Sequence, residues 1–181
     1  MSNETLRATV LEYIERHQTM TLATALDDRP WATPVFYASL GFKLYFLSSP
    51  RTSRHGKNLT ANPMVSASIT EDYPLKKMDD WRKIKGIQLE GAARILDKEA
   101  ELAQAIEAYV TKYPFTAPYL KGVFAFPRVA AILEKASRAL KIMPDFHASL
   151  ENRFYELVAE KVWFVDNETS FEKRKEVNIN E

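Results

Sequence analysis

The chain has 181 residues, a formal net charge of +1 and no cysteine. This length suits one domain with a sizeable core, so we predict a single domain over residues 1–181. The near-neutral charge argues against a nucleic-acid binder, and the lack of cysteine excludes disulfides, thiolate metal sites and cysteine nucleophiles. The sequence has no visible signal peptide or bilayer-spanning apolar run, so we expect a cytoplasmic protein that acts on a small molecule without a membrane partner.

The first half of the chain predicts one helix followed by strands. Leu6, Val10 and Ile14 recur at helical spacing, which predicts a helix over residues 5–17. The next segments are rich in Thr, Val and aromatic residues and are separated by turn-forming residues, which indicates strands over residues 20–26, 31–39, 43–48 and 64–70. Pro34 lacks an N–H, so its strand should lie at an edge or a bulge. The short connections favour an antiparallel meander that can close into a barrel.

The second half mixes helices with strands that complete the sheet. A long strand is predicted over residues 84–96, followed by an amphipathic helix that begins near Asp97. Residues 114–150 are interpreted as a helical excursion that covers a barrel face or a partner subunit. Two closing strands are predicted over residues 154–158 and 161–166.

A basic segment after the third predicted strand is the strongest candidate for a binding site. Residues 51–57 carry three cations, one histidine and two hydroxyls just before a predicted short helix. No Asp or Glu occurs from Arg29 to Thr70, so this positive charge is not neutralised locally. Helix N-terminal N–H groups and arginine side chains bind phosphate oxygens well. The segment therefore indicates a phosphate site, and a solvated basic loop is the alternative interpretation.

The sequence gives no catalytic or metal-ligating set. The three histidines, His17, His55 and His147, are far apart in the chain, which argues against a histidine metal site. The paired carboxylates fall in predicted turns or at a helix start, where solvation and capping explain them. We therefore assign no catalytic residue and no metal.

Several short segments together resemble a known family. They are Thr21-Leu22-Ala23-Thr24, Arg29 to Val35, Leu44-Tyr45-Phe46, and Thr52 to His55 followed by Asn58-Leu59 and Asn62-Pro63. In this order and at this hairpin spacing, the chain resembles the FMN-binding split barrels of the pyridoxamine 5'-phosphate oxidase-like superfamily. The resemblance implies a mainly β fold with flanking helices, a six-stranded antiparallel split β-barrel. It also implies a homodimer that holds FMN in a groove at the dimer interface.

The resemblance also implies which residues hold the cofactor. Ser53 and Arg54 would contact the FMN phosphate, with His55 and Lys57 nearby. The flavin would be lined by the backbone of Thr33, Pro34, Val35 and Phe36, by the hydroxyls of Ser48 and Ser49, and by Gln88 from a neighbouring strand.

The expected function is that of an FMN-dependent oxidoreductase with an unknown small substrate. The chain departs from the family at His55, where most members that resemble the oxidases carry lysine. The oxidases' substrate-binding arginine and histidine near the C-terminus have no match here. Two alternatives therefore stay open: a split barrel that binds haem or a deazaflavin, and a non-enzymatic dimer with a vestigial groove.

Overall fold

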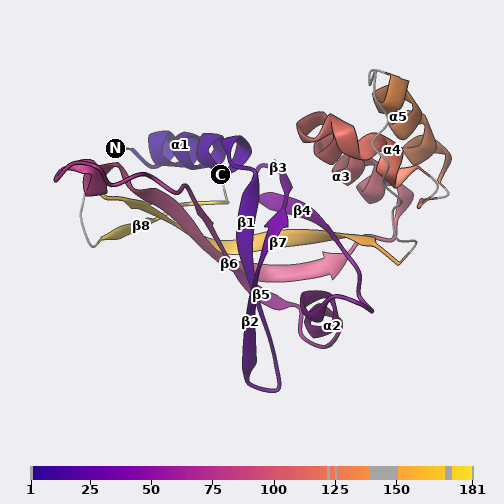
Figure 1. Cartoon of the computed structure of the whole chain (residues 1–181), viewed down its shortest axis with the longest axis horizontal. Coiled ribbons are helices and arrows are strands. Elements are labelled where there is room, and N and C mark those ends of the chain that lie inside the picture. Colours follow the sequence, from indigo (N-terminus) through magenta and orange to yellow (C-terminus); the bar gives the residue numbers. More distant parts are fainter. Residues whose placement is uncertain (1, 122, 125, 139–150, 170–172, 181) are drawn as a thin grey trace.

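The fold is one curved antiparallel sheet flanked by helices (Figure 1). The structure is a computed structural model, and it describes residues 2–121, 123–124, 126–138, 151–169 and 173–180. Helix α1 lies along one side of the sheet, and the helices after β6 gather at one end of it (Figure 1). This arrangement confirms the predicted mainly β fold with flanking helices.

The sheet has the order β2-β1-β5-β6-β7-β4-β3, with β8 paired to β7. Its strands are β1 (Thr19–Leu26), β2 (Arg29–Phe36), β3 (Ala38–Leu40), β4 (Lys43–Ser48), β5 (Met64–Thr70), β6 (Lys85–Ile95), β7 (Arg153–Asp166) and β8 (Arg174–Glu176). The helices are α1 (Asn3–Arg16), α2 (Arg54–Ala61), α3 (Glu99–Lys112), α4 (Ala117–Leu120) and α5 (Pro127–Arg138), with short 3₁₀ turns at Asp80–Lys83 and Pro114–Thr116.

The described sheet has eight strands where the resemblance implied six. Six are long, and the two additional strands, β3 and β8, have three residues each. The predicted strand 31–39 is divided at Tyr37, whose buried hydroxyl donates to the Ile14 carbonyl at 2.6 Å. The two predicted closing strands are one continuous strand, β7.

The order of the strands differs from a simple meander. After β2 the chain crosses to the other end of the sheet, where β3 pairs with β4 and β4 pairs with β7. Because β2 also lies close to β4, the sheet curls toward closure as a half-barrel. β2 is an edge strand, which explains how Pro34 is accommodated within it.

Two apolar clusters stabilise the fold on opposite faces of the strands. One lies between the sheet and α1, and the other lies between the sheet and α3 to α5. Strand β4 serves both, because Leu44 and Phe46 enter the first cluster and Tyr45, between them, enters the second. Alternate residues of a strand point to opposite faces, so a single strand joins the two clusters.

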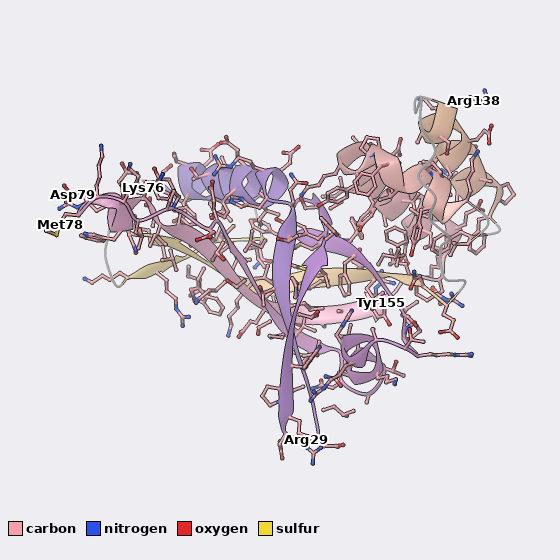
Figure 2. All side chains as sticks on the ribbon, in the orientation of Figure 1. Arg29, Lys76, Met78, Asp79, Arg138 and Tyr155 are labelled. Carbon is pink, nitrogen blue, oxygen red and sulfur yellow. The ribbon has the colours of Figure 1, made fainter. Side chains whose placement is uncertain are left out.

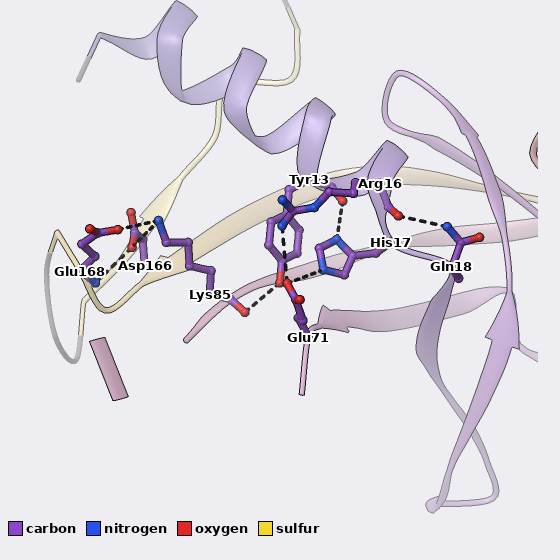
Figure 3. A network of polar contacts seen from close by, with 8 residues as sticks. All are labelled: Tyr13, Arg16, His17, Gln18, Glu71, Lys85, Asp166 and Glu168. Atoms are coloured by element: carbon purple, nitrogen blue, oxygen red, sulfur yellow. Dashed lines mark hydrogen bonds and ion pairs between the residues drawn. The ribbon is translucent and has the colours of Figure 1, made fainter. Parts of the chain in front are cut away.

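A polar network fixes the C-terminal end of α1 to the sheet (Figure 3). The Tyr13 hydroxyl donates to the Lys85 carbonyl at 2.9 Å, and its ring stacks on His17 with centroids 3.9 Å apart. Glu71, just after β5, lies 3.5 Å from Arg16 Nη2 and 3.6 Å from His17 Nε2. These contacts set where β1 begins, because β1 starts three residues after α1 ends.

The predicted helical excursion over residues 114–150 is helical where it is described. It contains α4 and α5, and α5 packs on α3 through Val129 and Leu133. The remainder, residues 139–150, lies outside the described residues.

We predict that two buried Tyr→Phe changes affect the free energy of unfolding to different extents. The single hydroxyl hydrogen of Tyr113 is shared between the carbonyls of Gln18, 2.6 Å away, and Tyr37, 2.8 Å away. Tyr113→Phe should lower the free energy of unfolding by about 1–3 kcal/mol, because buried acceptors lose their donor.

Tyr155→Phe is the matched control, since the buried Tyr155 hydroxyl has no hydrogen-bond partner in the described part of the chain. It should change the free energy of unfolding by less than about 0.5 kcal/mol or stabilise the protein. Urea unfolding of both variants tests the pair, and equal losses would contradict it.

Candidate functional site

The predicted phosphate segment forms the N-terminus of α2. Ser53 is the N-cap residue, with extended backbone, and its Oγ accepts a hydrogen bond from the Gly56 N–H at 3.0 Å. A serine at this position satisfies one of the four N–H groups that a helix start leaves unpaired. The side chain of Ser53 therefore explains why the helix begins at Arg54.

A chain of hydrogen bonds links the end of β4 to this helix start. The Ser53 hydroxyl donates to the Ser49 carbonyl at 2.7 Å, so it cannot also donate to Ser48 Oγ, which lies 2.8 Å away. Ser48 must then donate to Ser53, and His55 Nε2, 2.6 Å from Ser48 Oγ, must donate to Ser48. This proton count assigns the hydrogen of neutral His55 to Nε2 and leaves Nδ1 as an acceptor.

His55 is half-buried, and burial lowers the pKa of its imidazole below the ordinary value. At neutral pH the ring is therefore uncharged. Protonation would place a second N–H on Nδ1 without disturbing the bond to Ser48, because Nε2 is a donor in both states.

Close packing holds the first turn of α2 against the sheet. A Cβ at Gly56 would lie 2.0 Å from the Ser49 carbonyl oxygen, so only glycine fits there. Further along the helix, buried Asn58 donates to Thr24 Oγ1 at 2.9 Å, and Asn62 donates to the Ala25 carbonyl at 3.2 Å. The N-terminus of α2 is thus held rigidly over β1 and the end of β4.

The exposed side chains that a ligand could contact at this helix start are cationic. The Arg54 guanidinium is exposed and stacks over the Trp31 ring, 4.4 Å from its centroid. Lys57 is also exposed. The main-chain N–H groups of Arg54 and His55 have no backbone partner in the described part of the chain, as expected for a first helical turn.

The hydroxyls that were predicted to line the flavin are already used within the chain. Ser49 Oγ accepts from the N–H groups of Arg51, at 3.3 Å, and Thr52, at 3.1 Å, and lies 3.5 Å from Glu151 Oε2. Ser48 and Ser49 are both buried. In this arrangement the serines shape the loop, and their direct contact with a cofactor stays a prediction.

The remaining predicted residues are divided between two faces of the sheet. Thr33 and Val35 pair with Leu22 and Met20 and share their core-facing side, whereas Pro34 and Phe36 point to the other face. That outer face carries the cross-strand row Pro34, Thr21, Ser68, Gln88 and Trp163.

Gln88 lines a shallow cavity of about 380 Å³ on this outer face. The Arg174 side chain donates to Gln88 Oε1 at 2.9 Å and stacks over Trp163, 4.7 Å from the ring centroid. The structure therefore brings together the residues of the α2 N-terminus and places Gln88 on a separate surface of the same chain.

Sequence reasoning missed two residues of this site. Trp31, on a predicted strand, was not named among the site residues, but it is 37% exposed and lies under Arg54. Asn58 was not singled out, although a polar residue on the buried side of a short helix is a signal for a specific hydrogen bond.

The sequence matches the profile of the family described as pyridoxamine 5'-phosphate oxidase over residues 6–166. The chain belongs to this family. A relative, UPF0306 protein plu4501 of Photorhabdus laumondii, is 29% identical over 104 residues, which are 56% of this chain and 68% of the relative.

Solved structures share the fold at low sequence identity. An FAD-binding protein from Mesorhizobium loti is similar with a TM-score of 0.55 and 21% identity, over 91% of this chain and 94% of that protein. The haem storage protein HutZ from Vibrio cholerae is similar with a TM-score of 0.55 and 20% identity, over 86% and 91% of the two chains. Both support the split-barrel fold.

No group of three or more His, Asp or Glu residues in the described ranges is placed to hold a metal ion. None of the described helices is long and apolar enough to cross a membrane.

We predict that Gly56→Ala destabilises the protein. The added Cβ would meet the Ser49 carbonyl oxygen at 2.0 Å, so α2 or the end of β4 must move. Overpacking of this kind costs about 1–3 kcal/mol, more than the helix propensity gained with alanine. Lys57→Ala, on the exposed side of the same helix, should change the free energy of unfolding by less than about 0.5 kcal/mol. Equal stability of the two variants in urea unfolding would contradict the close approach.

We also predict that His55 makes the unligated protein sensitive to acid. Because its folded pKa is lowered, the unfolded state binds the proton more tightly, and stability from this group is lost as pH falls below the unfolded value of about 6.5. Between about pH 7.5 and 5.5 the wild type should lose more unfolding free energy than His55→Gln, in which only the other two histidines titrate. An identical pH dependence of the two proteins in urea titrations would refute this.

Proposed function

We propose that this protein binds FMN by its phosphate at the N-terminus of α2 and acts as a flavin-dependent oxidoreductase on a small substrate. The observation that carries the proposal is the cationic first turn of a rigidly held helix. Arg54 is exposed and fixed on Trp31, and Lys57 is exposed one turn further on. Arginine donors and free helix N–H groups are suited to a phosphate dianion.

The residues at this site fit a phosphate monoester. Two first-turn N–H groups and the Arg54 guanidinium are available as donors, while the serine hydroxyls are engaged in supporting the loop. No carboxylate is present in the sequence from residue 29 to 70, so this segment brings no negative charge of its own, and Glu151, 3.5 Å from Ser49 Oγ, is a carboxylate beside the loop. The buried and rigid attachment of α2 reduces the ordering cost of binding.

The histidine in place of the family's lysine is compatible with this proposal. His55 points toward Ser48 and is neutral at neutral pH. It therefore helps to hold the loop in place through its bond to Ser48 and adds no positive charge to the site. Arg54 and Lys57 supply the positive charge. A phosphate next to Nδ1 would favour the protonated ring, and FMN affinity should therefore increase as pH falls toward 6.

The chemistry of the bound flavin would be hydride or electron transfer at its ring system, with this chain supplying binding, orientation and electrostatics. The described site shows no side chain with the partners of a general acid or base directed at a ligand. We therefore propose no catalytic residue.

The partner in this proposal is a second copy of the chain. The outer-face cavity is lined by strand residues, of which Thr21, Ser66, Ser68 and Gln88 are uncharged, beside the charged Glu90 and Arg174. Such a face would allow two sheets to approach closely. A dimer formed there would place Gln88 at the interface, which is where the family resemblance implies the flavin groove.

Haem and a deazaflavin are the alternative ligands. The similarity to a haem storage protein motivates haem, but both imidazole nitrogens of His17 are directed to Tyr13 and Glu71. His55 could ligate haem iron only through Nδ1, because its Nε2 bonds to Ser48 Oγ. The anion-binding character of the α2 N-terminus favours a phosphorylated ligand over haem.

FMN titration of the purified protein tests the proposal. Quenching of Trp31 fluorescence on binding should report occupancy, because this ring lies under Arg54. Arg54→Ala should weaken FMN binding by about 1.5–3 kcal/mol through loss of a charge-assisted hydrogen bond, which corresponds to roughly 10- to 150-fold in Kd.

Arg128→Ala, an exposed arginine on α5, is the control and should leave Kd unchanged. A folded wild-type protein that fails to bind FMN, or that loses no affinity in Arg54→Ala, would overturn the proposal. A vestigial groove would give the first of these outcomes.

A further inference from the structure

A sizeable cavity of the described structure lies away from the α2 site. It has a volume of about 680 Å³ and is bounded by the C-terminal end of α1, the short strand β3 and the solvent-facing side of α3. Its lining combines apolar and hydrogen-bonding side chains. Among the lining residues are Gln18, Leu40, Gln104, Ala108, Thr111 and Lys112. A volume of this size accommodates a small organic molecule.

Lys112 is the distinctive group of this cavity. Its ammonium is half-buried, donates to the His17 carbonyl at 2.5 Å, and lies 4.3 Å from the centroid of the Tyr37 ring. Within the described part of the chain Lys112 forms no ion pair. An ammonium has three N–H donors, and the protein supplies one acceptor and the faces of two aromatic rings, Tyr37 and, at 5.8 Å, Tyr113.

The charged groups around Lys112 do not compensate its burial. Glu15 on α1 acts on it only at a distance, and Arg16 is paired with Glu71. Glu107 lines the same cavity from α3 and is exposed. Desolvation consequently dominates and lowers the pKa of Lys112 from 10.5 to about 8.

We propose that Lys112 is a covalent attachment site that forms an imine with a small polar aldehyde entering this cavity. The reaction balances without an oxidant or a reductant. The neutral Nζ attacks the carbonyl carbon and forms a C–N bond, while a proton passes from nitrogen to the carbonyl oxygen. The carbinolamine then takes up a proton from solvent, its C–O bond breaks with loss of water, and a protonated C=N bond remains.

The surroundings of Lys112 match this product better than they match an ammonium. A protonated imine has one N–H, which can still donate to the His17 carbonyl, and its positive charge stays near the face of Tyr37. Buried lysines with lowered pKa are the usual Schiff-base-forming amines in proteins. The proposal is independent of flavin binding, because it uses none of the residues of the α2 site.

Reductive trapping on the full-length protein tests the proposal. The protein is incubated with glycolaldehyde and sodium cyanoborohydride near neutral pH, and labelling of each lysine is followed by peptide mass spectrometry. At about pH 7, a lysine with a pKa near 8 has roughly two orders of magnitude more free amine than an ordinary lysine. Lys112 should therefore be labelled at least about tenfold faster than exposed Lys98 at the start of the same helix.

Two further measurements distinguish a binding site from a merely reactive amine. The rate at Lys112 should saturate with glycolaldehyde concentration, and it should level off above about pH 8.5, as expected for an amine with a pKa near 8. Lys112→Gln should remove the fast adduct, whereas Lys98→Gln should leave it unchanged. Labelling spread evenly over the lysines, or a rate at Lys112 that stays linear in aldehyde, overturns the proposal.

Discussion

The placement of α2 depends on one close contact, between the helix start and the carbonyl at the end of β4. Gly56 allows the helix to approach the Ser49 oxygen, and the Ser53 hydroxyl bonds to the same oxygen from the adjoining turn. A larger side chain at residue 56 would move the helix away, and the bonds that Ser48 donates to Ser53 and that His55 donates to Ser48 would be lost with it. The direction in which Arg54 projects follows from this contact.

The hydrogen-bond chain from His55 to Ser49 has a defined direction. Each donor has one acceptor, and the last acceptor is a carbonyl that cannot donate. For this reason the proton that His55 gains on acidification can appear only at Nδ1, on the side away from the serines. Burial disfavours the protonated ring at neutral pH because it removes hydration of the charge. An anion beside Nδ1 would offset that loss and favour protonation.

The sequence predicted elements well where one face of an element is buried and the other is not. Residues 64–70 alternate as predicted and form β5, and Ser53 begins α2 as an N-cap residue should. The break at Tyr37 was not predictable, because it depends on buried hydrogen bonds to residues about twenty positions earlier. The separation of Gln88 from the α2 site depends on the order of strands, which local periodicity does not encode.

The β1–β2 hairpin projects from the body of the sheet, with Arg29 at its tip, and β2 leaves one side of its backbone unpaired (Figure 2). Pro30 and Pro34 both lie on this strand with the same parity, opposite Ala25 and Thr21. Each proline lacks a backbone N–H on the outward edge. An extended chain that paired there would therefore lose every other N–H donor of β2. The edge is thereby protected against strand addition and aggregation.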